Sequence, residues 1–184
     1  MIYNKDANFL DKFVTYMMYV NCLAEIVIGI ILSTLIPIEV FFRYVLNSSL
    51  FVTEELSRVL FVWFGLLGVT IALHEGSHIG FDLLKNKFTG WSARFTSIVT
   101  AVVIFIYASA IAYGSILILP NQMAQKFYTM PFPIFWAYLA VTIGMIILAI
   151  RTLYTLVCLV QNRKENVPSL IDMFEKKKQE EIKL

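Results

Sequence analysis

The stretch Leu60-Phe-Val-Trp-Phe-Gly-Leu-Leu-Gly-Val-Thr-Ile-Ala-Leu73 decides the fold of this chain. It contains no charged residue and includes Trp63. A run of acidic and basic residues, Glu54 to Arg58, precedes it, and a cluster of Gly, His and Asp residues, Gly76 to Asp82, follows it. An apolar run between charged flanks is typical of a helix that crosses a bilayer, and the crowded flanks indicate that its ends meet specific partners.

The composition argues against a soluble domain. Of the 184 residues, 59% are hydrophobic and 15% are charged, whereas soluble domains carry about 25% charged residues. The net charge of +2 is too small to indicate a nucleic acid partner. Cys22 and Cys158 lie in apolar runs without a CxxC pair, so we interpret both as small hydrophobic residues. We therefore expect the lipid bilayer as the environment of this chain.

Four apolar runs predict an all-α integral membrane protein with four transmembrane helices. We expect spans at about 13–42, 53–75, 95–119 and 132–160, which form one membrane domain over 13–160. The first run exceeds the roughly 20 residues that a bilayer requires. Its helix is therefore expected to tilt, to kink at Pro37 or to extend beyond the bilayer, and we interpret it as a retained span and not a signal peptide.

Local signals predict where the helices end. Thr53 is a suitable N-cap for the second helix, and the third helix is expected to stop at Pro120-Asn121. Pro131 and Pro133 are expected in the opening turn of the fourth helix, where prolines are tolerated. Arg151, near the other end of that helix, is expected to extend its charged group toward the membrane surface.

The connections and termini predict the orientation. The segment 76–94 mixes apolar and charged residues and indicates an amphipathic segment at the membrane surface, which follows a sharp helix exit at Gly76. Most Lys and Arg residues lie in the N-terminus 1–12, in 76–94 and in the charged tail 161–184. With four spans these segments share one side, so the positive-inside rule predicts that both termini are cytoplasmic.

Glu25 is the costliest residue in the chain. It lies inside the first span, where a carboxylate costs on the order of 2 to 3 kcal/mol on insertion scales. Protonation, a partner within the chain or a partner on another protein would each lower this cost. An ion or proton site is one interpretation of Glu25, and polar contact between helices is the other.

Two pairs of charges lie near the opposite membrane surface. Glu39 and Arg43 are spaced i,i+4, as are Glu54 and Arg58, and in both pairs the Glu precedes the Arg, which is the better order for a helical ion pair. These charges either form a local network that holds the first two spans together or contact a second subunit, and one network can do both.

His74 and His78 are also spaced i,i+4 and could ligate a metal or haem. The chain has no other histidine, so ligands from a second span are lacking. His78 and Asp82 can pair instead. No nucleophile elbow, phosphate loop or paired catalytic carboxylate occurs, so we expect no enzyme. Four spans with so few polar residues also make a poor transport pathway alone.

The flanks of the second span resemble the small, Q-type (DctQ-like) membrane subunit of tripartite ATP-independent periplasmic (TRAP) transporters. In chain order, the matching features are Arg43-Tyr44-Val45, Glu55-Leu56-x-Arg58, Trp63 with Leu67-Gly68, Ala72-Leu73-x-Glu75-Gly76-x-His78-Ile79-x-x-Asp82, and Pro131-x-Pro133 to Tyr138. The resemblance covers the four spans. His74 departs from the pattern, since the family often has Arg there, so a fixed positive charge is not required at this position.

The resemblance implies a function. In this family a periplasmic or extracellular substrate-binding protein delivers an organic acid, often a dicarboxylate or sialic acid, to a complex in the bacterial inner membrane. The large membrane subunit holds the substrate and sodium sites and moves as an elevator, while the small subunit acts as its scaffold. We therefore expect no cofactor in this chain. The candidate interface residues are Glu25, Glu39, Arg43, Glu54, Glu55, Arg58, Trp63, His78 and Asp82. The competing hypothesis is a stand-alone, cytochrome-like four-helix subunit that uses His74 and His78.

Overall fold

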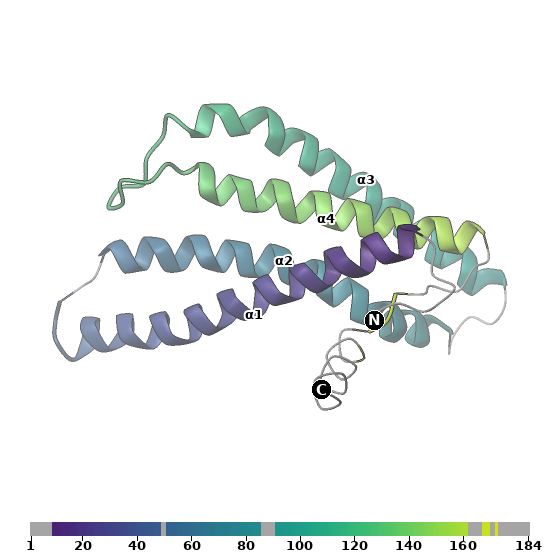
Figure 1. Ribbon diagram of the computed structural model, residues 1–184, viewed down its shortest axis with the longest axis horizontal. Helices are drawn as coiled ribbons and strands as arrows, with labels where there is room; N and C mark the ends of the chain where they lie inside the picture. Colours follow the sequence, from purple (N-terminus) through teal and green to yellow (C-terminus); the bar gives the residue numbers. More distant parts are fainter. Residues whose placement is uncertain (1–8, 49–50, 86–90, 162–166, 170–171, 173–184) are drawn as a thin grey trace.

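Four long helices make up the fold (Figure 1). The computed structural model describes residues 9–48, 51–85, 91–161, 167–169 and 172, with the backbone alone for 76–85 and 91–93. The helices are α1 (Phe9–Tyr44), α2 (Phe51–Lys85), α3 (Trp91–Gln122) and α4 (Phe135–Val160). Each contains a stretch long and apolar enough to cross a membrane. The all-α class and the four spans are confirmed.

The helices form two antiparallel hairpins, α1–α2 and α3–α4, with α2 and α4 adjacent in the middle (Figure 1). α3 packs chiefly against α4 and scarcely against α2. We call the end with the α1–α2 and α3–α4 connections the loop end. At the opposite end, the terminal end, α1 begins and α4 ends (Figure 1). The side of the membrane on which each end lies stays a prediction.

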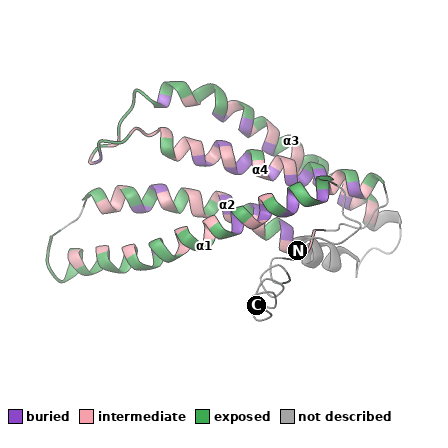
Figure 2. Cartoon of the chain, viewed as in Figure 1, coloured by how far each residue is buried: buried purple, intermediate pink, exposed green. Residues whose placement is uncertain are grey.

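The packed core of the described residues is small, and most large apolar side chains point outward. Exposed residues follow the outer faces of α1 and α3 (Figure 2); on α3, Val103, Ile106 and Tyr113 are 59%, 61% and 68% exposed. A water-soluble protein rarely exposes so large an apolar surface. Lipid or an apolar partner surface is the environment that suits these faces.

Small residues bring the central helices close together. Ala108 and Ala112 of α3 are buried with Met145 and Leu148 of α4. On the α2-facing side of α4, a Cβ added to Gly144 would lie 3.0 Å from the Cβ of Leu66. Close approach at small residues is the usual basis of helix packing in membranes, where hydrophobic burial gives no separate driving force.

The helix ends differ from the sequence-based predictions in four places. α3 runs through Pro120 and ends at Gln122, one residue after the predicted stop at Pro120-Asn121. A proline removes only its own hydrogen bond to the preceding turn, and the last turn of a helix can lose that bond. α2 begins at Phe51, before Thr53, and runs without a break through Gly76 to Lys85. The predicted helix exit at Gly76 is therefore wrong, whereas the position of 76–94 at the membrane surface stays a prediction.

Pro131 and Pro133 precede α4 instead of lying in its opening turn. They belong to a loop in which the N–H of Phe127 donates to the carbonyl of Phe132 and the N–H of Ile134 donates to the carbonyl of Gln125. These cross-loop bonds hold the chain in an extended hairpin, so the helix starts only at Phe135. α1 contains Pro37 and has 36 residues, about 54 Å at 1.5 Å per residue. It therefore exceeds the hydrocarbon thickness, as expected.

Candidate functional site

The terminal end holds a buried polar network centred on Arg151. The Nε and Nη2 atoms of Arg151 donate to Nδ1 of His74 at 3.2 and 3.0 Å, and Nη1 donates to Oγ1 of Thr155 at 2.6 Å. His74 Nε2 lies 3.2 Å from the carbonyl of Pro168. Arg151 is 3% and His74 is 5% exposed. The prediction that Arg151 extends to the surface is wrong, because α2 supplies an acceptor within the protein.

This geometry defines which ring nitrogen of His74 carries the proton. A guanidinium group is only a donor, so Nδ1 must accept, and Nε2 must carry the proton that it donates to Pro168. Both ring nitrogens are therefore engaged in hydrogen bonds, which leaves no ring nitrogen of His74 for haem iron. Among the described residues, no group of three His, Cys, Asp or Glu side chains is placed to hold a metal ion.

Two further contacts tie the other helices to α4 at the terminal end. The hydroxyl of Tyr154 donates to Asp11 Oδ1 of α1 at 2.9 Å, and the Arg151 guanidinium lies 5.6 Å from the centre of the Tyr154 ring. Arg94 of α3 donates to the carbonyl of Leu159 at 2.6 Å, in the last turn of α4. Basic groups at a helix C-terminus satisfy carbonyls that have no partner in the helix. α4 is thus the common partner of α1, α2 and α3 here.

Midway along the α1–α2 interface, Asn21 and Glu25 face α2. The side-chain amide of Asn21 donates to the carbonyl of Leu67 at 3.2 Å. A Cβ added to Gly68 would lie 2.7 Å from Oε1 of Glu25, so the carboxyl group rests against the backbone of α2 where a side chain is missing. Asn21 Oδ1 and Glu25 Oε2 are buried and have no hydrogen-bond partner in the described part of the chain.

At the loop end, Glu55 holds the α3–α4 connection. Its carboxylate accepts hydrogen bonds from the backbone N–H groups of Tyr128, Thr129 and Met130 at 2.9, 2.9 and 3.0 Å, and from the Thr129 hydroxyl. Charge-assisted bonds of this kind are stronger than neutral ones. Glu55 therefore joins the two hairpins of its own chain, and this contact was not predicted.

The other loop-end charges only partly follow the predicted pairs. Arg58 forms the expected ion pair with Glu54. In contrast, Glu39 accepts a hydrogen bond from the Ser57 hydroxyl at 3.3 Å, and Arg43 lies 6.0 Å from the centre of the Tyr44 ring. The described residues include no Glu39–Arg43 ion pair. Glu39 faces α2, and this orientation explains its choice of Ser57.

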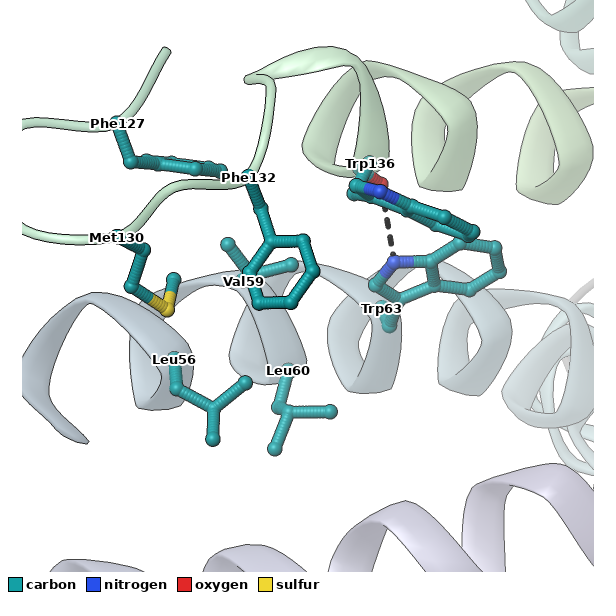
Figure 3. A pocket seen from close by; sticks show the side chains of 8 residues that line it. All are labelled: Leu56, Val59, Leu60, Trp63, Phe127, Met130, Phe132 and Trp136. Atoms are coloured by element: carbon teal, nitrogen blue, oxygen red, sulfur yellow. Dashed lines mark hydrogen bonds between the residues drawn. The ribbon is translucent and has the colours of Figure 1, made fainter. Parts of the chain in front are cut away.

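An apolar pocket of about 270 Å³ lies beside the Glu55 contact, between α2 and the α3–α4 loop (Figure 3). α2 and α4 place two indoles there, and the Trp63 N–H donates to the carbonyl of Trp136 at 3.1 Å. Phe132 points from the loop toward α2 (Figure 3). The lining residues are Leu56, Val59, Leu60, Trp63, Phe127, Met130, Phe132 and Trp136.

The predicted site residues thus fall into separate groups. Glu54, Glu55, Arg58 and Trp63 lie at the loop end, Glu25 lies midway along α1, and the side chains of His78 and Asp82 lie outside the described residues. Sequence reasoning missed the contacts of Arg151 with His74 and of Tyr154 with Asp11. In the sequence, these contacts are indicated only by polar residues near the ends of the spans, and this pattern does not show which residues pair.

Known proteins resemble this chain over most of its membrane domain. Residues 32–162, more than half of the chain, match the family described as tripartite ATP-independent periplasmic transporters, DctQ component. A putative TRAP transporter small permease protein from Haemophilus influenzae (strain KW20 / Rd) is 29% identical over 106 residues, 58% of this chain and 64% of that protein. The sialic acid TRAP transporter small permease protein SiaQ from Vibrio cholerae is 26% identical over 110 residues, 58% of this chain and 61% of SiaQ.

A longer protein also contains a related stretch. The sialic acid TRAP transporter permease protein SiaT from Haemophilus influenzae (strain 86-028NP) is 30% identical over 93 residues, 49% of this chain but 15% of SiaT. The matches to the two small permease proteins span less than two thirds of those relatives. Together with the four apolar helices, the match to the family establishes that this chain is a multi-pass bacterial inner-membrane protein that belongs to the DctQ component family of TRAP transporters.

Proposed function

We propose that this chain is the small permease subunit of a binding-protein-dependent, sodium-coupled transporter for organic acids, and that it braces a large permease subunit. The match to SiaT carries this proposal, because a stretch related to this chain forms a small part of a much longer permease. In SiaT this related stretch is joined to the rest of the permease, so we expect this chain to contact a permease of the same kind. Because SiaQ and SiaT are named as sialic acid transporter proteins, sialic acid is the organic acid that we favour as the substrate.

The geometry supports a bracing role. The polar side chains of the described residues tie helices together: His74 with Arg151, Tyr154 with Asp11, and Glu55 with the α3–α4 loop. None of these contacts lines a continuous polar path through the four helices. The broad apolar faces of α1 and α3 offer surface for a membrane partner. In this proposal, substrate and sodium bind in the large subunit.

We propose that the partner contact lies at the loop end, at charged side chains of α1 and α2. Arg58 is the best candidate, because its side chain is 72% exposed and, in the described part of the chain, forms an ion pair only with the neighbouring Glu54. Arg43 and Glu39 lie at the same end. Glu55 is a weaker candidate for a direct contact, since its carboxylate already accepts hydrogen bonds from three backbone N–H groups of its own chain. These residues would meet the large subunit or the docked substrate-binding protein.

The test is Arg58→Gln in the transporter encoded by the native host. We expect reduced co-purification of the large subunit or reduced uptake of the organic acid, because the change removes an exposed charge without disturbing a buried contact. Lys126→Gln is the matched control, since it removes another exposed basic residue from the loop end. Unchanged co-purification and unchanged uptake with Arg58→Gln would remove Arg58 from the interface.

A further inference from the structure

Glu25 lies near the middle of α1, inside the apolar run 13–42. It is 16 residues after Phe9 (25 − 9) and 19 before Tyr44 (44 − 25), the two ends of α1. At 1.5 Å per residue, the nearer helix end is about 24 Å away. A carboxylate at this depth needs a partner that compensates its charge or a proton that removes it.

The apolar central parts of the four spans contain no cation. The ranges 13–42, 59–73, 95–119 and 135–150 contain no Lys, Arg or His, and His74 and Arg151, nearer the terminal end, contact each other. On the α2 face that Glu25 contacts, 59–73 contains no titratable residue. The titratable residues near Glu25 on α1 are Tyr19 and Cys22, and neither is a cation. Among the described residues, no cation therefore forms an ion pair with Glu25.

The hydrogen bonds at this site lack one donor. Asn21, 3% exposed, uses its amide N–H to reach the Leu67 carbonyl, and no described residue pairs with its buried Oδ1. The buried Oε2 of Glu25 likewise has no partner among the described residues. Gly68 supplies space for the carboxyl group but no donor, because the backbone N–H groups inside α2 are used by the helix.

We propose that Glu25 is a neutral carboxylic acid that binds one proton and donates it to Oδ1 of Asn21. The two residues are spaced i,i+4 on α1, where polar side chains form hydrogen bonds. A protonated carboxyl group is a donor, so one proton removes the charge and satisfies both buried oxygen atoms. A cation from a partner subunit could approach Glu25 from outside, but it could not reach Asn21 Oδ1, which is buried inside this chain.

The test is an infrared difference spectrum of the full chain, in the complex in which it purifies, reconstituted into lipid at neutral pH. Wild type minus Glu25→Gln should show the carbonyl band of a protonated carboxylic acid, which shifts in D₂O. Glu39→Gln, on the same helix at the loop end, is the matched control and should leave this band in place. Loss of carboxylate bands alone in Glu25→Gln would overturn the proposal.

The stability of the variants provides a second test. Glu25→Gln should leave the thermal unfolding midpoint unchanged, because its amide N–H can donate to Asn21 in place of the proton. Glu25→Ala should lower the midpoint, since it leaves Asn21 Oδ1 without a donor. Two results would show that a cation binds the Glu25 carboxylate and that the proposal is wrong. One is that Glu25→Gln no longer purifies with the large subunit. The other is that sodium raises the thermal unfolding midpoint of the wild type but not that of Glu25→Gln.

Discussion

Replacing His74 with alanine removes the acceptor that the buried Arg151 guanidinium uses on α2. A hydrogen bond to a charged group contributes about 1.5 to 3 kcal/mol and a neutral one about 1 kcal/mol. The described contacts of His74 include both kinds, since it accepts from the Arg151 guanidinium and donates to the carbonyl of Pro168. Both side chains are at least 95% buried, so little solvent screening applies. We expect His74→Ala to lower the free energy of unfolding by about 2.5 to 4 kcal/mol.

The assay is equilibrium unfolding of the purified full chain in mixed micelles with increasing SDS, followed by tryptophan fluorescence. The informative control is the double variant His74→Ala/Arg151→Met, which also removes the buried charge. Because an apolar residue often replaces a buried charge without loss, the double variant should be more stable than His74→Ala alone. A His74→Ala protein within about 0.5 kcal/mol of wild type, the range of ordinary surface substitutions, would refute the reasoning.

Three further predictions concern the α2–α4 contact and the α3–α4 loop. Glu55→Ala should speed hydrogen exchange at the loop amides that its carboxylate now binds, and unchanged exchange would show that the loop does not depend on Glu55. Gly144→Ala should lower the unfolding free energy by about 1 to 3 kcal/mol, because its Cβ would meet Leu66 at 3.0 Å. Gly65→Ala is the control, since a Cβ there would have no neighbouring atom within 4 Å. Equal effects of the two substitutions would contradict the close α2–α4 packing. Trp63→Phe should cost about 1 kcal/mol through the lost bond to the Trp136 carbonyl, and a neutral result in the same unfolding assay would count against that bond.

Hydropathy and length were enough to predict the four helices, because each span must contain about 20 apolar residues. The Glu54–Arg58 pair was also predictable, since both residues lie on one helix and their spacing alone brings them together. In contrast, Glu39 and Arg43 have the same spacing and do not pair. Glu39 faces α2, and the hydroxyl of Ser57 is within its reach.

The interhelical contacts could not be predicted in this way. Arg151 and His74 are 77 residues apart, and Tyr154 and Asp11 are 143 apart. Such pairs depend on how the helices are rotated and shifted against one another, and a single sequence does not contain this information. The contact of Glu55 was missed for a related reason. Its partners are backbone N–H groups of a loop, which any residue type except proline can supply.

The proline predictions failed because they considered the helix alone. Pro131 and Pro133 would be tolerated in an opening helical turn, but cross-loop hydrogen bonds hold this segment in a hairpin, and the helix begins only at Phe135. The Glu55 carboxylate, which binds the preceding part of the same loop, supports this arrangement. The tertiary contact therefore decides where α4 begins.

The most direct test of the central claim, that this chain braces a large permease subunit, is affinity purification of the tagged chain from its native host in a mild detergent. Mass spectrometry of the purified material identifies whatever accompanies it. We predict one stoichiometric, many-spanning permease of the TRAP type. A chain that purifies alone under conditions that preserve other membrane complexes would contradict the proposed function.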